Sequence, residues 1–304
     1  MTTKKKLITS EDPKGLDATA KWRAVYNKQK LTDGAQGSAQ RLNESKFFWK
    51  ELGELIQKHT AISLYANEQI ASSCAYPKEY KLKPVEEQIK TIAKIFGLDP
   101  KEALEFIKAL PELPEGAEGW FAIPKVSAIA KNFFPELTNP TEQYCEAVSV
   151  VLCKIADSRD FYNHCSYRIN EIVPLKFRQS ARTTDFMEQF IESKQPGDIV
   201  IIAVQYGIKH RGESVCRARE TFAGNEFGLG AFALGCMVLV HPNRYVRCEE
   251  LDTDGAGDEF SPYGDGVFSR APYFSFGVKL KFGTDDVSSV HGLYGSVSGF
   301  VQQS

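Results

Sequence analysis

Hydrophobic side chains recur every three or four residues in several segments between residues 40 and 195, which is the period of an amphipathic helix. Two of these segments begin at Asp99-Pro100 and Asn139-Pro140, where a capping side chain precedes a proline at the first helical position. The segment 111–119 is rich in Pro and Gly and predicts a loop, followed by an anchoring Trp120-Phe121 pair. The predicted helices are 44–58, 85–96, 99–110, 139–157 and 182–194.

The pattern changes at Gln195-Pro-Gly-Asp198, and sixteen of the 23 glycines lie between residues 197 and 304. Residues 199–204 form a continuous hydrophobic run, which predicts a strand covered on both faces. Two helices are expected at 214–223 and 226–240, the second buried on all sides. Further strands are predicted at 245–248, 273–276, 278–282 and 294–301.

These elements predict an α+β fold, because most of the later strands are not joined by helices. We expect a helical N-terminal part packed on a smaller part with a mixed or antiparallel sheet and about two helices. The expected divisions are a polar arm at 1–40, a helical part at 41–195 and a Gly-rich α+β part at 196–304.

Composition narrows the class of protein without indicating its function. The chain has 304 residues, 42% hydrophobic and 25% charged, with a net charge of -2, which excludes collagen-like and wholly disordered classes. The longest apolar run, 227–240, is shorter than the roughly 20 residues that span a bilayer. No apolar segment follows Met-Thr-Thr-Lys-Lys-Lys, and the seven cysteines include no Cys-x-x-Cys pair. We therefore expect a soluble cytoplasmic protein.

The first candidate site is the basic segment 207–219, which follows the buried strand and opens a helix. Lys209, His210, Arg211 and Arg217 would lie beside the free N–H groups of a helix start, a suitable environment for a phosphate or carboxylate. The Gly-Lys-[Ser/Thr] sequence of a Walker loop is absent. The alternative is that these cations pair with the acidic segment that follows.

The second candidate is the acidic segment 249–265, which contains seven carboxylates and no Lys or Arg. Oxygen ligands suit Mg²⁺ or Ca²⁺, and the expected ligands are Asp252, Asp254, Asp258 and Glu259. An EF-hand loop is excluded, because Ala256 and Tyr263 stand at its fifth and twelfth positions. The alternatives are a solvated turn and a partner for the basic segment.

The third candidate is Cys216, near a helix start and close in sequence to Arg217 and Arg219. Such surroundings lower a thiol pKa, and His210, His241 or His291 would have to serve as the base. The alternative is a cysteine used only for packing.

Two other motifs are rejected. Gly228-Leu-Gly230-Ala-Phe-Ala233 matches a dinucleotide fingerprint but follows a predicted helix instead of a strand. Gly295-Ser-Val-Ser-Gly299 has no Ser at the centre of a nucleophile elbow.

The C-terminal two thirds resembles a group of bacterial proteins without an assigned function. The resemblance rests on short stretches spread along the chain: Gln195–Asp198, His210–Gly212, Asn225–Ala233, His241-Pro242, Gly257–Pro262, Arg270–Pro272 and Gly295–Phe300. It implies a bacterial cytoplasmic origin and no particular chemistry.

The leading functional hypothesis is a protein that binds an anionic, phosphate-bearing small molecule or nucleic acid at the basic segment. One alternative is an interaction or assembly protein, with a protein partner or self-association, in which both charged segments are structural. Another is a metal-dependent phosphoryl or phosphodiester enzyme that uses both segments.

Overall fold

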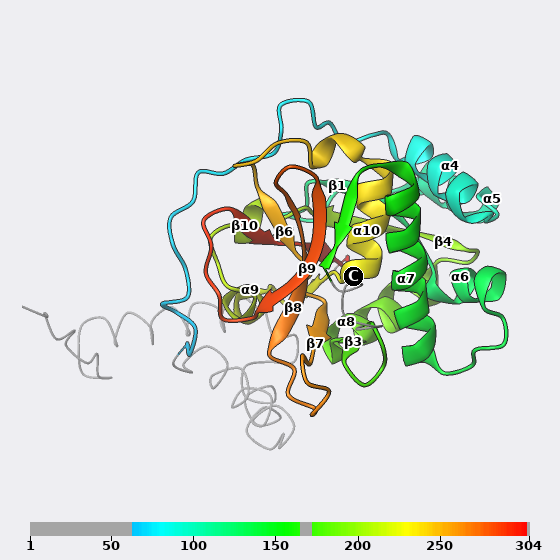
Figure 1. The fold of residues 1–304 in the computed structure, drawn as a ribbon. Helices are drawn as coiled ribbons and strands as arrows, with labels where there is room; N and C mark the ends of the chain where they lie inside the picture. Colours follow the sequence, from blue (N-terminus) through cyan, green and yellow to red (C-terminus); the bar gives the residue numbers. More distant parts are fainter. Residues whose placement is uncertain (1–62, 165–171, 303–304) are drawn as a thin grey trace, which may run out of the picture. The chain divides into compact units, whose positions relative to one another are not determined.

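The computed structural model describes residues 63–164 and 172–302 (Figure 1), and from Leu64 on they lie in the compact unit Leu64–Ser304. The fold is α+β, as predicted. The α-helices are α4 (Val85–Phe96), α5 (Lys101–Phe106), α6 (Val126–Phe133), α7 (Pro140–Ser158), α8 (Ala181–Phe186), α9 (Val215–Thr221) and α10 (Ala231–Val240). The strands are β1 (Gly119–Pro124), β2 (Phe161–Asn163), β3 (Phe177–Gln179), β4 (Ile199–Gln205), β5 (Glu226–Gly228), β6 (Asp252–Asp254), β7 (Asp258–Phe260), β8 (Arg270–Phe276), β9 (Leu280–Asp286), β10 (Tyr294–Ser296) and β11 (Ser298–Phe300).

One sheet is antiparallel and has the strand order β1-β4-β11-β5. All residues of β4 are buried, which explains the uninterrupted hydrophobic run at 199–204. Its partner β1 contains Trp120 and Phe121, the expected anchor after the loop, and Phe121 is buried in the core. The strand itself was not predicted, because its partner β4 lies about 80 residues away and leaves no local signal.

The second sheet is mixed and has the order β10-β6-β8-β7-β3, with β9 pairing both β8 and β2. The pairs β10–β6 and β2–β9 are parallel, and the other pairs are antiparallel. The predicted single strand 294–301 is two strands in different sheets, because the chain crosses from β10 to β11 at Val297. The predicted strand 278–282 begins later and extends to Asp286. Residues 245–248 form no strand.

The predicted boundary at residue 195 lies within this compact unit. Strands β1, β2 and β3 precede that boundary, yet they pair with β4, β9 and β7, which follow it. A single main hydrophobic core includes buried side chains from α4, α7, β4, α10 and β8. The predicted arm 1–40 and helix 44–58 lie outside the described residues.

Several predicted helices are confirmed, with their capping signals. Helix α4 has the predicted bounds, and Gly97 follows it in the left-handed conformation with φ 67°. The side chain of Asn139 accepts hydrogen bonds from the N–H groups of Thr141 and Glu142 at the start of α7. The predicted helix 182–194 is instead α8 followed by a π-helical turn, Met187–Ile191, and a 3-10 turn, Glu192–Lys194.

Helix α10 lies at the centre of the fold beside α7 (Figure 1) and also packs on β1 and α4. It carries apolar side chains on all sides, and all of its residues are buried except Leu239, which is half-buried. The predicted helix 226–240 starts later than expected, because Glu226–Gly228 forms strand β5. None of the helices within the described ranges is long and apolar enough to cross a membrane.

Two backbone turns approach each other closely at the start of α10. Gly228 is the last residue of β5, where the turn into α10 begins, and the turn between β6 and β7 contains Gly257. The Gly257 N–H donates to the carbonyl of Leu229 at 3.0 Å, and a Cβ atom on Gly257 would lie 2.5 Å from the Gly228 oxygen. Only residues without side chains allow this contact.

We therefore expect Gly257→Ala to reduce the free energy of unfolding by about 1 to 3 kcal/mol, the usual cost of overpacking. Gly224→Ala is the matched control, because no atom lies within 4 Å of a Cβ at Gly224. Urea unfolding measures both. Equal stability of the two variants would show that the turns can separate freely.

Candidate functional site

The basic segment places Lys209 and His210 around one buried carboxylate, that of Glu226 on β5. Glu226 Oε1 accepts from Ser298 Oγ at 2.6 Å and lies 2.8 Å from His210 Nε2. Its Oε2 accepts from Lys209 Nζ and from the Ala223 N–H, the latter at 3.1 Å. Burial raises the pKa of Glu226, but the hydrogen bonds from His210, Lys209 and Ser298 outweigh burial and lower the pKa to about 2.

His210 connects two carboxylates. Its Nδ1 lies 2.9 Å from Glu213 Oε2, on the opposite side of the ring from Glu226. Burial lowers the pKa of His210, but the hydrogen bonds and charges of Glu213 and Glu226 outweigh it and raise the pKa. Because both ring nitrogens face carboxylate oxygens, which only accept, the arrangement favours the imidazolium form and disfavours a role as general base.

The other cations of this segment also have partners within the protein. Arg211 Nη1 donates to the carbonyl of Cys74 at 2.9 Å, and Arg217 Nη1 pairs with Glu220 at 2.8 Å. Arg219 donates to the carbonyls of Ala256 and Asp258 at 2.9 and 2.6 Å. The basic segment therefore contacts the acidic one through backbone oxygens, and anion binding at Lys209, His210, Arg211 and Arg217 stays a prediction.

The four predicted metal ligands lie on two strands and have different surroundings. Asp252 on β6 is buried and accepts from the Phe276 N–H at 2.9 Å. Glu259 on β7 pairs with Arg178 at 2.8 Å. Burial, with the charges of Asp285 and Asp252, raises the pKa of Asp254 to about 8. No three His, Cys, Asp or Glu side chains in the described part of the chain are grouped to hold a metal ion.

The fourth predicted metal ligand, Asp258, caps helix α10. Its Oδ2 accepts from the Ala231 N–H at 2.6 Å, and its Oδ1 accepts from the Tyr144 hydroxyl at 2.7 Å. Burial raises the pKa of Asp258 to about 7, although both hydrogen bonds favour the ionised form. The acidic segment is therefore not a solvated turn, since Asp252 and Asp258 are both buried.

The motif Gly228–Ala233 is also corrected by this geometry. It follows strand β5 and opens α10, so the stated reason for rejecting a dinucleotide site, a preceding helix, was wrong. The rejection stands for another reason. The Asp258 carboxylate occupies the helix start where a phosphate would bind, and a Cβ on Gly230 would overlap with it.

Cys216 does not have the surroundings of a nucleophile. Burial raises its thiol pKa, and the charge of Glu68 adds to the effect, whereas Arg219 lowers it only in part. Each of the three candidate bases is hydrogen-bonded elsewhere. His210 contacts Glu213 and Glu226, and His291 contacts Asp285. The His241 ring contacts the Lys83 N–H and the Met237 carbonyl. The structure thus gives Cys216 none of the three proposed bases.

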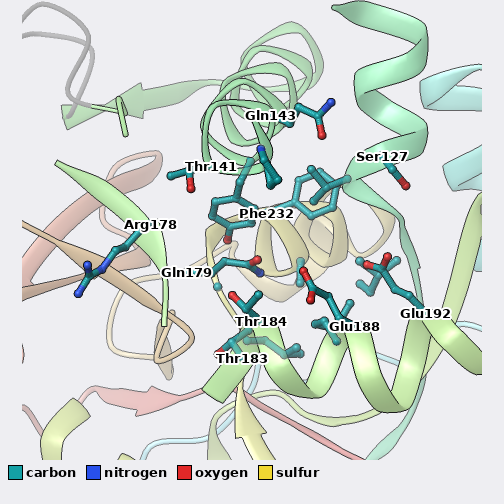
Figure 2. Close-up of a pocket in the computed structure, with 18 of the residues that line it drawn as sticks. Ser127, Thr141, Gln143, Arg178, Gln179, Thr183, Thr184, Glu188, Glu192 and Phe232 are labelled. Carbon is teal, nitrogen blue, oxygen red and sulfur yellow. The ribbon is translucent and has the colours of Figure 1, made fainter. Parts of the chain in front are cut away.

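A cavity of about 290 Å³ that the sequence analysis missed lies between α6, α7, β3, α8 and the start of α10 (Figure 2). Its walls come from four separate segments of the chain. The lining side chains include apolar residues, Ile123, Pro124, Val126, Met187, Leu229, Phe232 and Ala233, and polar ones, Ser127, Thr141, Gln143, Tyr144, Arg178, Gln179, Thr183, Thr184, Glu188 and Glu192. Thr184, Glu188 and Glu192 are four residues apart, a polar stripe that was visible in the sequence.

Some polar groups of the cavity are used by the fold. Tyr144 donates to Asp258, Thr183 Oγ1 to the Gly228 carbonyl at 2.9 Å, and Gln143 Nε2 to the Leu137 carbonyl at 2.6 Å. In contrast, no side-chain hydrogen bond or ion pair to another described residue is found for Gln179, Glu188 or Glu192. These three side chains lie at the cavity with unused hydrogen-bonding capacity.

Comparison of the chain with protein-family models, curated proteins and solved structures finds no match. The resemblance to uncharacterised bacterial proteins therefore stays a prediction.

We expect Glu226→Gln to reduce the free energy of unfolding by about 3 to 5 kcal/mol at neutral pH, because His210 and Lys209 lose their buried partner. The pKa of Glu226 is lowered from 4.5 to about 2, so its contribution is present above pH 4.5. That contribution is lost as the pH falls towards about 2. Urea unfolding across this range should show the difference between wild type and variant shrinking with acid.

Glu259→Gln is the control, because it removes a carboxylate from a more exposed ion pair and should cost less than about 1 kcal/mol. A difference between wild type and Glu226→Gln that does not change from pH 4.5 to 2 would contradict the assigned charge network.

Proposed function

We propose that this protein binds a small organic molecule in the cavity between α6, α7, α8 and α10. The observation that carries the proposal is the presence of three polar side chains, Gln179, Glu188 and Glu192, that line the cavity without partners within the described ranges. Gln179 and Glu192 are half-buried and Glu188 is exposed, so their polar atoms are not tied up by the fold. They are therefore available to orient a ligand in the cavity.

The composition of the walls supports the same proposal. Small-molecule sites are concave, largely apolar and contain a few polar groups that orient the ligand, with volumes from about 300 Å³. Here Phe232, Met187 and Leu229 supply apolar surface, and the volume of about 290 Å³ suits a small ligand. Part of one wall is the π-helical turn Met187–Ile191, and such turns occur frequently at functional sites.

The basic segment has less support as the binding site. Lys209 and His210 neutralise Glu226, so an anion there would compete with a buried carboxylate for the same donors. The proposal concerns binding and assigns no reaction.

Filling the cavity should abolish binding without unfolding the protein. Thr184 lines the cavity, and we expect Thr184→Trp to occupy the space that a ligand would use. The measurement is crystallographic soaking with a defined fragment library of neutral, cationic and anionic compounds. We expect fragment density in the wild-type cavity and none in the Thr184→Trp cavity.

Thr91→Trp is the matched control, because both threonines are half-buried on helices and donate to the carbonyl four residues earlier. It should retain the fragments. Ser127→Trp, on an exposed position of the opposite wall, repeats the test if Thr184→Trp does not fold. Fragments that avoid the wild-type cavity, or that bind equally in the cavity-filled variants, would overturn the proposal.

A further inference from the structure

Two Asp-Gly dipeptides of the described chain have opposite surroundings. Asp254-Gly255 stands at the end of strand β6, whereas Asp265-Gly266 lies in the loop 261–269 between β7 and β8 (Figure 1). A third, Asp33-Gly34, lies outside the described residues. In an Asp-Gly dipeptide the backbone nitrogen of the glycine can attack the aspartyl side chain, because glycine places no side chain beside that nitrogen. The two described sites therefore present the same chemistry in a strand and in a loop.

The loop site is open, and its backbone is adaptable. Asp265 and Gly266 are both exposed, and a Cβ atom on Gly266 would meet no atom within 4 Å. The glycines on either side of Asp265, Gly264 and Gly266, have φ 68° and 84°. Glycine moves between backbone conformations at little steric cost, so this peptide can rotate towards the neighbouring side chain.

The Asp265 carboxylate is folded over the nitrogen that would attack it. Its Oδ1 accepts from the Val267 N–H at 3.0 Å and from Ser261 Oγ at 3.1 Å. The first of these bonds closes an Asx turn, in which the side chain curls forward over the peptide between residues 265 and 266. The Gly266 N–H donates to no other residue in the described ranges, so no hydrogen bond holds this nitrogen away from the carboxylate.

We infer that Asp265-Gly266 is a modification site, at which the backbone isomerises spontaneously from aspartate to isoaspartate. The Gly266 nitrogen forms a bond to Cγ of Asp265, the bond from Cγ to its hydroxyl breaks, and the amide hydrogen leaves with that hydroxyl as water. Water then opens the cyclic imide at either carbonyl, which restores aspartate or leads the main chain through the former side-chain carboxyl. Atoms and electrons balance without an oxidant or a second reactant. The inference is independent of the proposed cavity ligand.

The product cannot keep the contacts of the turn. In isoaspartate the main chain is one methylene longer, and the free carboxylate is attached directly to Cα. The Val267 N–H and Ser261 Oγ therefore lose the acceptor that the Asx turn gives them. We expect the loop, which carries the exposed side chains of Tyr263 and Val267, to change conformation on isomerisation.

The strand site lacks the freedom of the loop site. The Gly255 N–H donates to the Pro272 carbonyl at 2.7 Å, and the Asp254 carbonyl accepts from the Val297 N–H at 3.0 Å. Strand β6 lies between β10 and β8, so rotation of this peptide would disturb pairing on both sides. Attack on Asp254 must therefore wait for an internal strand to open, which is a rare event in a folded protein.

The test incubates the full chain at about pH 5, where a fraction of exposed Asp side chains is protonated and water can leave. Endoproteinase Asp-N cleaves before aspartate and not before isoaspartate, so digestion and mass spectrometry measure the loss of cleavage at residues 265 and 254 separately. We expect isomerisation of Asp265 at least about a hundredfold faster than that of Asp254, because the opening of an internal strand approaches the free energy of global unfolding.

The rate at Asp265 should fall between about pH 5 and about pH 8. The hydrogen bonds from the Val267 N–H and Ser261 lower the pKa of Asp265, so its carboxyl is ionised at the higher pH and has no hydroxyl to release.

Two controls show whether the fold causes the difference between the sites. In the full chain unfolded in urea, both dipeptides are accessible and should isomerise at similar rates. Asp265→Glu keeps the charge, but its side chain would have to close a six-membered ring, which forms much more slowly. Labelling with an isoaspartyl methyltransferase should therefore mark the loop peptide of the incubated wild type and leave that of Asp265→Glu unmarked.

Equal rates at Asp265 and Asp254 in the folded chain would overturn the inference. Aspartate that persists at residue 265 of the folded chain, over a time in which the unfolded chain isomerises at both sites, would also overturn it. The same holds for methyl labelling of the loop that persists in Asp265→Glu, since the product would then not arise at residue 265.

Discussion

The carboxylate of Asp258 at the start of α10 is the contact on which most of the architecture depends. It caps the central helix by accepting a hydrogen bond from the Ala231 N–H, and it accepts another from the Tyr144 hydroxyl on α7. The carbonyl of the same residue accepts from Arg219 on α9. One residue of the second sheet therefore holds three helices, and Gly230, which has no Cβ, makes room for its carboxylate. The cavity opens beside this junction, since Tyr144 and Gly230 both line it.

The fold neutralises most of its buried charges internally. Glu226 is surrounded by Lys209, His210 and Ser298, so a carboxylate without exposure remains ionised. Arg244 is also buried. Its guanidinium lies 4.2, 4.9 and 4.6 Å from the ring centres of Tyr76, Tyr206 and Tyr245, and it donates to the Leu251 carbonyl at 2.6 Å. Ring faces and carbonyl oxygens thus replace an anion as its partners.

The cavity is different, because its carboxylates are not enclosed by the protein: Glu188 is exposed and Glu192 is half-buried. Both belong to the segment in which α8 gives way to a π-helical turn and then a 3-10 turn. A helix that changes its hydrogen-bonding pattern twice in eight residues is unlike the regular α4 and α7. The irregular segment forms part of the wall of the cavity, which Glu188 and Glu192 line.

The sequence by itself determined the elements whose signals are local. The α+β class, helix α4 with Gly97, the Asn139 cap and the buried strand β4 all follow from short-range periodicity and capping chemistry. Only the tertiary structure decided which charged residues meet. Lys209 and Glu226 are seventeen residues apart, and Tyr144 and Asp258 are 114 apart, so no local pattern relates them. For the same reason the strongest charge clusters in the sequence were assigned to ligands, although in the folded chain most of those residues bind one another or the backbone. The cavity was missed because its walls come from four segments, and a site of that kind exists only after the chain has folded.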